Sequence, residues 1–222
     1  MRDRTDSGAG EVLAARFRVY LVTDRQATRG RPLPALVDAC LGAGLRAVQL
    51  REKDLGGRAL LDLARAIQPL TARYAGRLLF NDRVDVALAA SADGVHLPGD
   101  GLPPDVTRGL IGPGCLIGVS THSAVEGEAA LQAGADFVVF GPVYDTPSKR
   151  LYGPPQGVAA LAEVCRRVTI PVLAIGGVTP DRVPEIRAAG AAGVAVIRAL
   201  LEADDPGRAT RELLDAWERG HV

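Results

Sequence analysis

Eight short apolar runs recur along the chain, and each stops abruptly at a polar or glycine-rich cluster. Short, nearly continuous apolar runs are typical of parallel strands that are covered on both faces. Amphipathic stretches lie between them, such as residues 57–73, where Leu60, Ala64 and Ile67 recur on one helical face. The runs predict strands at residues 17–22, 46–50, 77–80, 94–97, 115–119, 137–140, 171–175 and 193–197.

This alternation of strands and helices predicts an α/β fold, a single-domain (β/α)8 TIM barrel. The chain has 222 residues, which is enough for eight such units. We expect residues 1–16 to form an N-terminal arm with a short helix, and residues 17–222 to form the catalytic barrel domain. An open, doubly wound sheet is the alternative, but no Gly-x-Gly-x-x-Gly motif follows an early strand.

Charge and composition exclude several classes of protein. Lysine plus arginine balance aspartate plus glutamate at 26 each, and 4% of residues are aromatic, so neither a global field nor a stacking surface favours nucleic acid. No apolar segment is long enough to cross a bilayer, and the polar residues 1–10 lack the apolar core of a signal peptide. We therefore expect a cytoplasmic protein without nucleic-acid or membrane partners.

Polar clusters follow nearly every predicted strand. In a parallel barrel the carboxyl ends of the strands share one face, where loops from different strands converge on a ligand. The sequence therefore predicts one functional rim. Its candidate residues are Gln49 to Lys53, Asn81, Asp82, Asp100, Ser120, Thr146 to Lys149, Gly176, Gly177, Ile197 and Arg198.

Glycines and carboxylates in this set indicate phosphate and metal chemistry. Gly176 and Gly177, before a helix, would let backbone N–H groups approach a phosphate, although a tight turn alone would also explain the pair. Asp82 and Asp100 supply the hard oxygen ligands that Mg2+ prefers, alongside substrate phosphate oxygens. As an isolated signal, Asp82 is better explained as the cap of the following helix.

Cations from two loops complete the predicted rim. Arg51, Lys53 and Lys149 would bind a diphosphate and stabilise its charge as it leaves, and a solvated charged surface is the alternative. His96 and His122 have no acid or nucleophile partner nearby in the sequence. We therefore interpret both as hydrogen-bonded, half-buried side chains rather than general bases.

Six ordered motifs resemble the thiamine phosphate synthase family, within a superfamily that also contains thiazole tautomerases. The resemblance extends from about Val19 to Leu200 and implies an enzyme of the transferase class. The motifs are Gln-Leu-Arg-Glu-Lys at 49–53, Asn-Asp at 81–82, Ala-Asp-Gly-Val-His-Leu at 92–97, Gly-Val-Ser-x-His at 118–122, Gly-Pro-Val-Tyr-x-Thr-x-Ser-Lys at 141–149 and Ala-Ile-Gly-Gly at 174–177.

The resemblance also implies a reaction and a role for each residue. Such enzymes join 4-amino-2-methyl-5-(diphosphooxymethyl)pyrimidine to a thiazole phosphate by a dissociative mechanism with Mg2+ as cofactor, releasing diphosphate and forming thiamine phosphate. By resemblance, the pyrimidine diphosphate is bound by Gln49, Leu50, Arg51, Glu52, Lys53, Asn81, Ser120 and Lys149, of which Arg51, Lys53, Ser120 and Lys149 are catalytic. The thiazole phosphate is bound by Thr146, Pro147, Ser148, Gly177, Ile197 and Arg198, and Asp82 holds the metal.

Three departures from the family pattern bear on these roles. An acidic metal ligand is usual at the position of Gly101, and Asp100 is the carboxylate that would replace it from one residue earlier. Ser148 stands where a second threonine is usual, which keeps the hydroxyl donor. Arg198 stands where a small hydroxyl residue is common, and its guanidinium would either grip the phosphate or crowd it.

Two alternatives stay open at this stage. The Pro98-Gly99 turn is similar to that of the thiazole tautomerases, which isomerise a thiazole carboxylate phosphate without a metal, but Pro142 stands where the synthases have it. A non-catalytic protein that binds thiazole or thiamine phosphate would keep the phosphate loops and lose the metal. The expected partners are the two small-molecule substrates, and the sequence leaves the formation of a homo-oligomer open.

Overall fold

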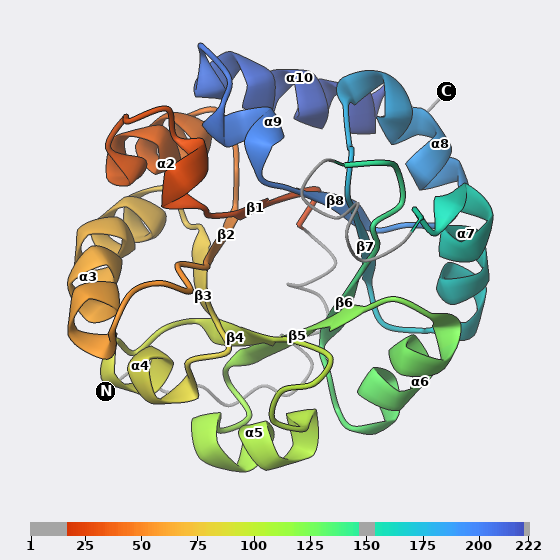
Figure 1. Ribbon diagram of the computed structural model, residues 1–222, viewed down its shortest axis with the longest axis horizontal. Helices are drawn as coiled ribbons and strands as arrows, with labels where there is room; N and C mark the ends of the chain where they lie inside the picture. Colours follow the sequence, from red (N-terminus) through yellow and green to blue (C-terminus); the bar gives the residue numbers. More distant parts are fainter. Residues whose placement is uncertain (1–16, 147–153, 220–222) are drawn as a thin grey trace.

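The computed structural model describes residues 17–146 and 154–219. Eight parallel strands close into one barrel in sequential order, with β8 paired to β1 (Figure 1). The predicted TIM barrel is therefore confirmed. The strands are β1 (Val19–Val22), β2 (Ala47–Leu50), β3 (Arg77–Asn81), β4 (Gly94–Leu97), β5 (Leu116–Thr121), β6 (Phe137–Phe140), β7 (Val172–Ile175) and β8 (Gly193–Val196).

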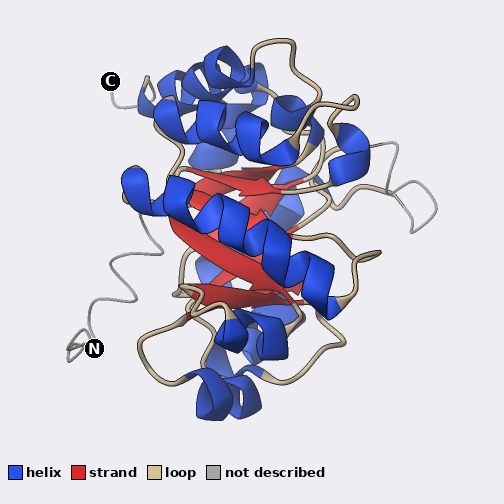
Figure 2. Ribbon diagram, turned by 90° about the vertical axis from the view of Figure 1, so that its left-hand side faces the viewer, coloured by secondary structure: helices blue, strands red, loops and turns tan. Residues whose placement is uncertain are grey.

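Helices surround the barrel and cover its outer face (Figure 1, Figure 2). Because all strands run parallel, their carboxyl ends and the loops that follow lie at one end of the barrel. The helices are α2 (Leu33–Gly42), α3 (Gly57–Arg73), α4 (Val84–Ala89), α5 (Pro104–Ile111), α6 (Ala124–Gln132), α7 (Gly157–Arg167), α8 (Val183–Ala188), α9 (Arg198–Leu201) and α10 (Pro206–Glu218), with 3-10 turns at Arg25–Ala27 and Pro180–Arg182.

Two separate apolar clusters stabilise the fold. Strand residues such as Leu21, Val48 and Leu50 point outward and pack against the helices. Their neighbours, such as Tyr20 and Leu79, point inward and fill the barrel. Fully burying one large apolar side chain contributes roughly 1.5–3 kcal/mol, so both clusters are substantial. The alternation also decides which residue at each strand end faces the centre of the rim.

The observed strands agree with the predicted ones to within two residues at each end. The apolar pattern gave no sign of α9, because its four residues are too few to show a helical period. No helix in residues 17–146 or 154–219 is long and apolar enough to span a membrane. The predicted N-terminal arm and short helix, residues 1–16, lie outside the described residues.

Candidate active site

The motif at the end of β2 is divided between the two faces of the sheet. Gln49 is buried inside the barrel, where its Nε2 lies 3.4 Å from the hydroxyl of Tyr20. Leu50 faces the helices, so its backbone is the part that a ligand at the rim can reach. Arg51 and Lys53 follow at the rim, the first half-buried and the second exposed.

Glu52 is the buried carboxylate of this motif, with 7% of its surface exposed. Its oxygens accept hydrogen bonds from the hydroxyl of Thr23 at 2.7 Å and the backbone N–H of Arg25 at 3.0 Å. The Thr23 oxygen in turn accepts the N–H of Arg51 at 2.9 Å. Burial raises the pKa of Glu52, against the opposing effect of Thr23 and Arg25. The carboxylate is therefore engaged within the protein, where it orders the loop that carries Arg51.

Polar and aromatic side chains from several strands meet inside the barrel. His96 Nε2 lies 2.9 Å from Ser120 Oγ, and the imidazole packs on the rings of Tyr20 and Phe137 at centroid distances of 5.9 and 5.8 Å. The interpretation of His96 as a half-buried, hydrogen-bonded side chain is only partly right. The side chain is hydrogen-bonded through Nε2, but it is 2% exposed and its Nδ1 has no hydrogen-bond partner among the described residues. Burial lowers its pKa to about 3, and the charge of Arg51 adds to the shift. The imidazole is therefore neutral, is hydrogen-bonded to Ser120 and senses the positive charge of Arg51.

Asp82 has a backbone φ of 62°, which is uncommon for a residue with a side chain. Its N–H donates to the carbonyl of His96 at 2.9 Å, and this bond fixes it at the end of β3. The cap position of α4 is Arg83, without a side-chain cap bond, so Asp82 is not the helix cap. A Cβ added at Gly101 would lie 3.3 Å from Asp82 Oδ1. The loop after β4 thus brings the Gly101 position beside this carboxylate.

Among the residues that the structure describes, the carboxylate of Asp82 belongs to no closed metal cluster. The described residues contain no group of three or more His, Cys, Asp or Glu side chains that could hold a metal ion. Asp100 is exposed in the loop after β4. Mg2+ is commonly held by one or two carboxylates together with water and substrate phosphate oxygens. Asp82 fits such a shared site.

The turn after β7 offers backbone groups in place of side chains. Gly176 and Gly177 have φ values of 100° and 64°, in the region that favours glycine. A Cβ added at Gly176 would lie 2.6 Å from Cβ of Pro142, and one at Gly177 would lie 2.8 Å from Cβ of Tyr144. The loop after β6 therefore packs directly against this turn, and neither position has room for a side chain.

Comparisons with known proteins agree with this geometry. A family model described as thiamine monophosphate synthase matches residues 19–200. The chain belongs to the thiamine monophosphate synthase family. A thiamine-phosphate synthase of Roseiflexus castenholzii is 46% identical over 197 residues, which cover 89% of this chain and 86% of that protein. One from Anaeromyxobacter dehalogenans is 47% identical over 184 residues, covering 83% and 82%.

A solved structure of the same family supports the assignment. The thiamine phosphate pyrophosphorylase from Pyrococcus furiosus superposes with a TM-score of 0.86 at 34% sequence identity, covering 95% of this chain and all of that one. The resemblance inferred from the six motifs is therefore confirmed at the level of the family.

Within this member of the thiamine monophosphate synthase family, the end of β8 departs from the expected pattern. Arg198 is exposed, and its Nε lies 3.3 Å from a carboxylate oxygen of Glu202 along α9. Ile197 is half-buried and packs against both apolar clusters. Thr146 is half-buried at the end of the described part of the β6 loop. The remaining residues predicted in this loop, Pro147, Ser148 and Lys149, lie outside the described residues.

Two other predicted residues are placed by the ends of β3 and β5. Asn81 is the last residue of β3, is half-buried, and stands in register with His96. His122 follows β5, and its Nδ1 lies 2.5 Å from the carbonyl oxygen of Gly141. The interpretation of His122 as a hydrogen-bonded side chain is confirmed, although the residue is more exposed than predicted.

The sequence did not predict the residues that hydrogen-bond to the rim residues and hold them in place. Thr23 links Glu52 to Arg51, and Arg182 donates to the carbonyl of Gly177. The polar ending of the first predicted strand was the available signal for Thr23. Arg182 had none, because its contact joins a helical turn to a loop and leaves no periodicity in the sequence.

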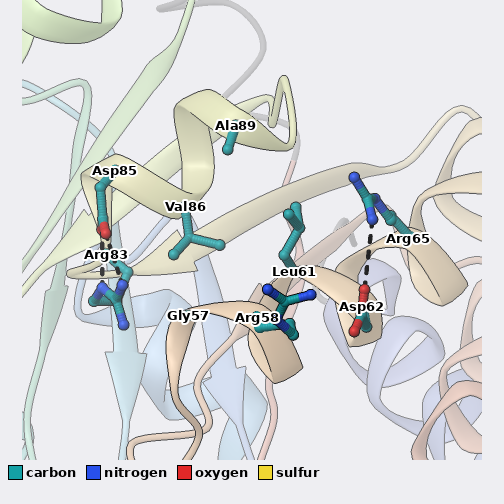
Figure 3. Close-up of a pocket in the computed structure, with 9 residues that line it drawn as sticks. All are labelled: Gly57, Arg58, Leu61, Asp62, Arg65, Arg83, Asp85, Val86 and Ala89. Carbon is teal, nitrogen blue, oxygen red and sulfur yellow. Dashed lines mark hydrogen bonds and ion pairs between the residues drawn. The ribbon is translucent and has the colours of Figure 1, made fainter.

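A surface groove of about 470 Å³ lies between α3 and α4, on the outer helical layer (Figure 3). Arg83 donates two hydrogen bonds to the carboxylate of Asp85, at 2.8 and 2.7 Å. Arg65 lies 3.5 Å from Asp62 on the other wall. The charged side chains of these two pairs neutralise each other on the helical surface of the groove.

Proposed function

We propose that the chain is a thiamine phosphate synthase whose rim binds a pyrimidine diphosphate on the β2 to β5 side and a thiazole phosphate on the β6 to β8 side. The observation that carries the proposal is the hydrogen bond between Ser120 and a buried, neutral His96, in a chain of this family that keeps Arg51 at the neighbouring rim. The synthases of Roseiflexus castenholzii and Anaeromyxobacter dehalogenans support the activity, since they match most of this chain at high identity.

Departure of diphosphate is the step that these residues would assist. Arg51 and Lys53, with Lys149 from the β6 loop, would bind the diphosphate and stabilise the charge that develops as it leaves. Asp82 would hold Mg2+ together with diphosphate oxygens, and the ion would neutralise part of that charge. Ser120, oriented by His96, would hold the pyrimidine while its methylene carbon becomes cationic and is captured by the thiazole nitrogen.

The rest of the pyrimidine site would come from the ends of β2 and β3. Gln49 and Asn81 would contact the pyrimidine diphosphate through their side chains, and Leu50 through its backbone. Glu52 would act indirectly, because Thr23 and Arg25 occupy its carboxylate.

The thiazole phosphate would be held mainly by backbone groups. Gly177 lets its N–H approach a phosphate closely, and Ile197 and Arg198 stand at the start of α9 on the neighbouring strand end. Thr146, Pro147 and Ser148 would complete this site from the β6 loop.

The thiazole tautomerase is the second candidate, favoured by the Pro98-Gly99 turn and by Gly101. An isomerase must take and return a proton, whereas His96, buried inside the barrel beside Ser120, has a pKa of about 3 and is a poor base near pH 7. A dissociative synthase needs no such base, because its catalysts stabilise a leaving group. The site therefore supports the synthase better.

The decisive assay is thiamine phosphate formation from the two purified substrates, with Mg2+ and with excess chelator. We expect product only with Mg2+, and a loss of roughly 100-fold or more in turnover for Asp82→Asn. Asp85→Asn is the matched control, because Asp85 lies three residues after Asp82, is exposed and is ion-paired with Arg83. Absence of product in both conditions, with thiazole phosphate still bound, would favour the tautomerase or a binding protein. The formation of a homo-oligomer stays a prediction.

A further inference from the structure

The turn after β7 has both of its carbonyl groups engaged on one side. The carbonyl of Gly176 accepts the backbone N–H of Tyr144 at 3.1 Å, and the carbonyl of Gly177 accepts Nη1 of Arg182 at 2.5 Å. In a planar trans peptide the carbonyl and the next N–H point in opposite directions. The N–H groups of Gly177 and Val178 must therefore point away from Tyr144 and Arg182.

Within residues 17–146 and 154–219, nothing accepts a hydrogen bond from these two N–H groups. Neither donates to a backbone carbonyl in the described part of the chain, although buried N–H groups in proteins are nearly always paired. An adjacent pair of N–H groups in a turn with positive φ is a common way to bind an anion. The orientation of the turn, and not a side chain on it, decides whether that pair faces the ligand.

Arg182 is held in place by groups that do not belong to the turn. Its guanidinium lies over the ring of Tyr144, 4.4 Å from the ring centroid. The hydroxyl of Tyr144 donates to Oε1 of Glu185 at 2.5 Å, on α8. Burial and the neighbouring Glu185 raise the pKa of Tyr144, so its hydroxyl keeps the proton that it donates. Arg182 therefore connects three elements: the β6 loop, the β7 turn and the start of α8.

The contacts leave the turn little freedom. A Cβ at Gly177 would lie 2.8 Å from the carbonyl oxygen of Asp145 and 3.2 Å from Nη1 of Arg182. The β6 loop and Arg182 thus both pack closely against Gly177. Loss of Arg182 would free the carbonyl of Gly177 and allow the peptide to rotate.

We infer that Arg182, braced by Tyr144 and Glu185, is a positioning residue for phosphate recognition, because it fixes the peptide between Gly177 and Val178 and so holds the Val178 N–H, next to that of Gly177, open to the phosphate of the thiazole substrate. The inference rests on the proposed function for the identity of the ligand. Arg182 donates its hydrogen bond to the carbonyl of Gly177, so it acts on the phosphate through the backbone of the turn.

Calorimetric titration of the full chain with the thiazole phosphate, and with the corresponding thiazole alcohol, tests this role. We expect Arg182→Ala to weaken binding of the phosphate about ten-fold and to change binding of the alcohol less than two-fold. In turnover, the KM for the thiazole phosphate should rise while kcat and the KM for the pyrimidine diphosphate stay near their wild-type values. Arg208→Ala is the matched control, an exposed arginine with one ion pair on α10.

Tyr144→Phe is the second variant, and it keeps the ring under Arg182 while removing the bond to Glu185. We expect it to weaken phosphate binding in the same direction by about two- to three-fold. If Arg182→Ala fails to fold, as judged by its melting curve, Tyr144→Phe decides alone. Equal weakening of phosphate and alcohol, or no change in either, would overturn the inference.

Inorganic phosphate separates this inference from the proposed function. If the wild-type chain makes no thiamine phosphate, the function proposed above fails. Binding of inorganic phosphate that depends on Arg182 would still uphold the positioning role. Binding of inorganic phosphate that is unaffected by Arg182→Ala would overturn it, whatever the outcome of the activity assay.

Discussion

The two halves of the rim use different parts of the polypeptide. On the β2 to β5 side, the candidate groups are side chains such as Arg51, Asp82 and Ser120, and buried partners order several of them. On the β6 to β8 side, the main candidate groups are the backbone N–H groups of Gly177 and Val178. Charged side chains suit a diphosphate whose charge changes during reaction, whereas fixed backbone groups suit a phosphate that stays intact. Recognition and chemistry should therefore be separable by mutation.

The largest effect is expected from Gly177→Ala on the backbone side. The added Cβ would meet the carbonyl oxygen of Asp145 at 2.8 Å, at a φ of 64° that disfavours side chains. We expect stability to fall by about 1–3 kcal/mol and the affinity for thiazole phosphate to fall about 10- to 100-fold. Thermal melting and calorimetry would measure the two.

Gly109→Ala is the control for this substitution. Gly109 lies in α5, and its added Cβ would meet open space, so alanine should stabilise the helix by roughly 0.5–1 kcal/mol. An unchanged affinity of Gly177→Ala for thiazole phosphate would remove the glycine turn from the phosphate site.

The pH dependence of stability tests whether His96, on the β2 to β5 side, is held neutral inside the barrel. Its folded pKa of about 3 lies below the unfolded value of 6.5, so its contribution to stability is present above pH 6.5 and is lost as pH falls toward 3. Between pH 7 and pH 4 this group should cost the wild type roughly 3 kcal/mol.

His96→Gln, which does not titrate, should lose less stability than the wild type over that range in urea unfolding. His122→Gln, at the exposed histidine, is the control and should follow the wild type. Equal acid losses in all three proteins would show that His96 is not held neutral inside the barrel.

A smaller effect is expected from Thr23→Val, which tests how Arg51 is ordered. Valine would leave the carboxylate of Glu52 and the N–H of Arg51 without the hydroxyl between them, at a cost of about 1–3 kcal/mol. Turnover should fall with thiazole phosphate binding unchanged. Thr23→Ser should restore both stability and turnover. If the serine variant is as impaired as the valine variant, the packing of Thr23 and not its hydroxyl group orders Arg51.

The smallest effect is expected from Arg198→Ala. Its guanidinium is exposed and paired with Glu202, and such pairs contribute less than about 1 kcal/mol. We expect the dissociation constant of thiazole phosphate to change less than about two-fold. A ten-fold weakening in calorimetry would instead show that Arg198 grips the phosphate, and a ten-fold tightening would show that it crowds the site.

The sequence predicted the barrel and the rim because both follow from local patterns. Short apolar runs mark the strands, and the polar cluster after each run marks the end that binds ligands. The direction of side chains beyond the strands was not predictable in the same way. Glu52 belongs to the motif, yet it turns to Thr23 and Arg25, which are distant in sequence. Arg182 reaches Gly177 across a turn that has no repeating pattern.

The most direct test of the division between the β2 to β5 side and the β6 to β8 side is to measure how each substrate alone binds to two variants. Calorimetry would measure the pyrimidine diphosphate and the thiazole phosphate, each alone, on Arg51→Ala and on Gly177→Ala. We predict a crossed result: Arg51→Ala weakens the pyrimidine diphosphate at least about ten-fold and spares the thiazole phosphate, while Gly177→Ala does the reverse. Two variants that each lose both ligands to the same extent, while both remain folded at the temperature of the titration, would contradict this division of the rim.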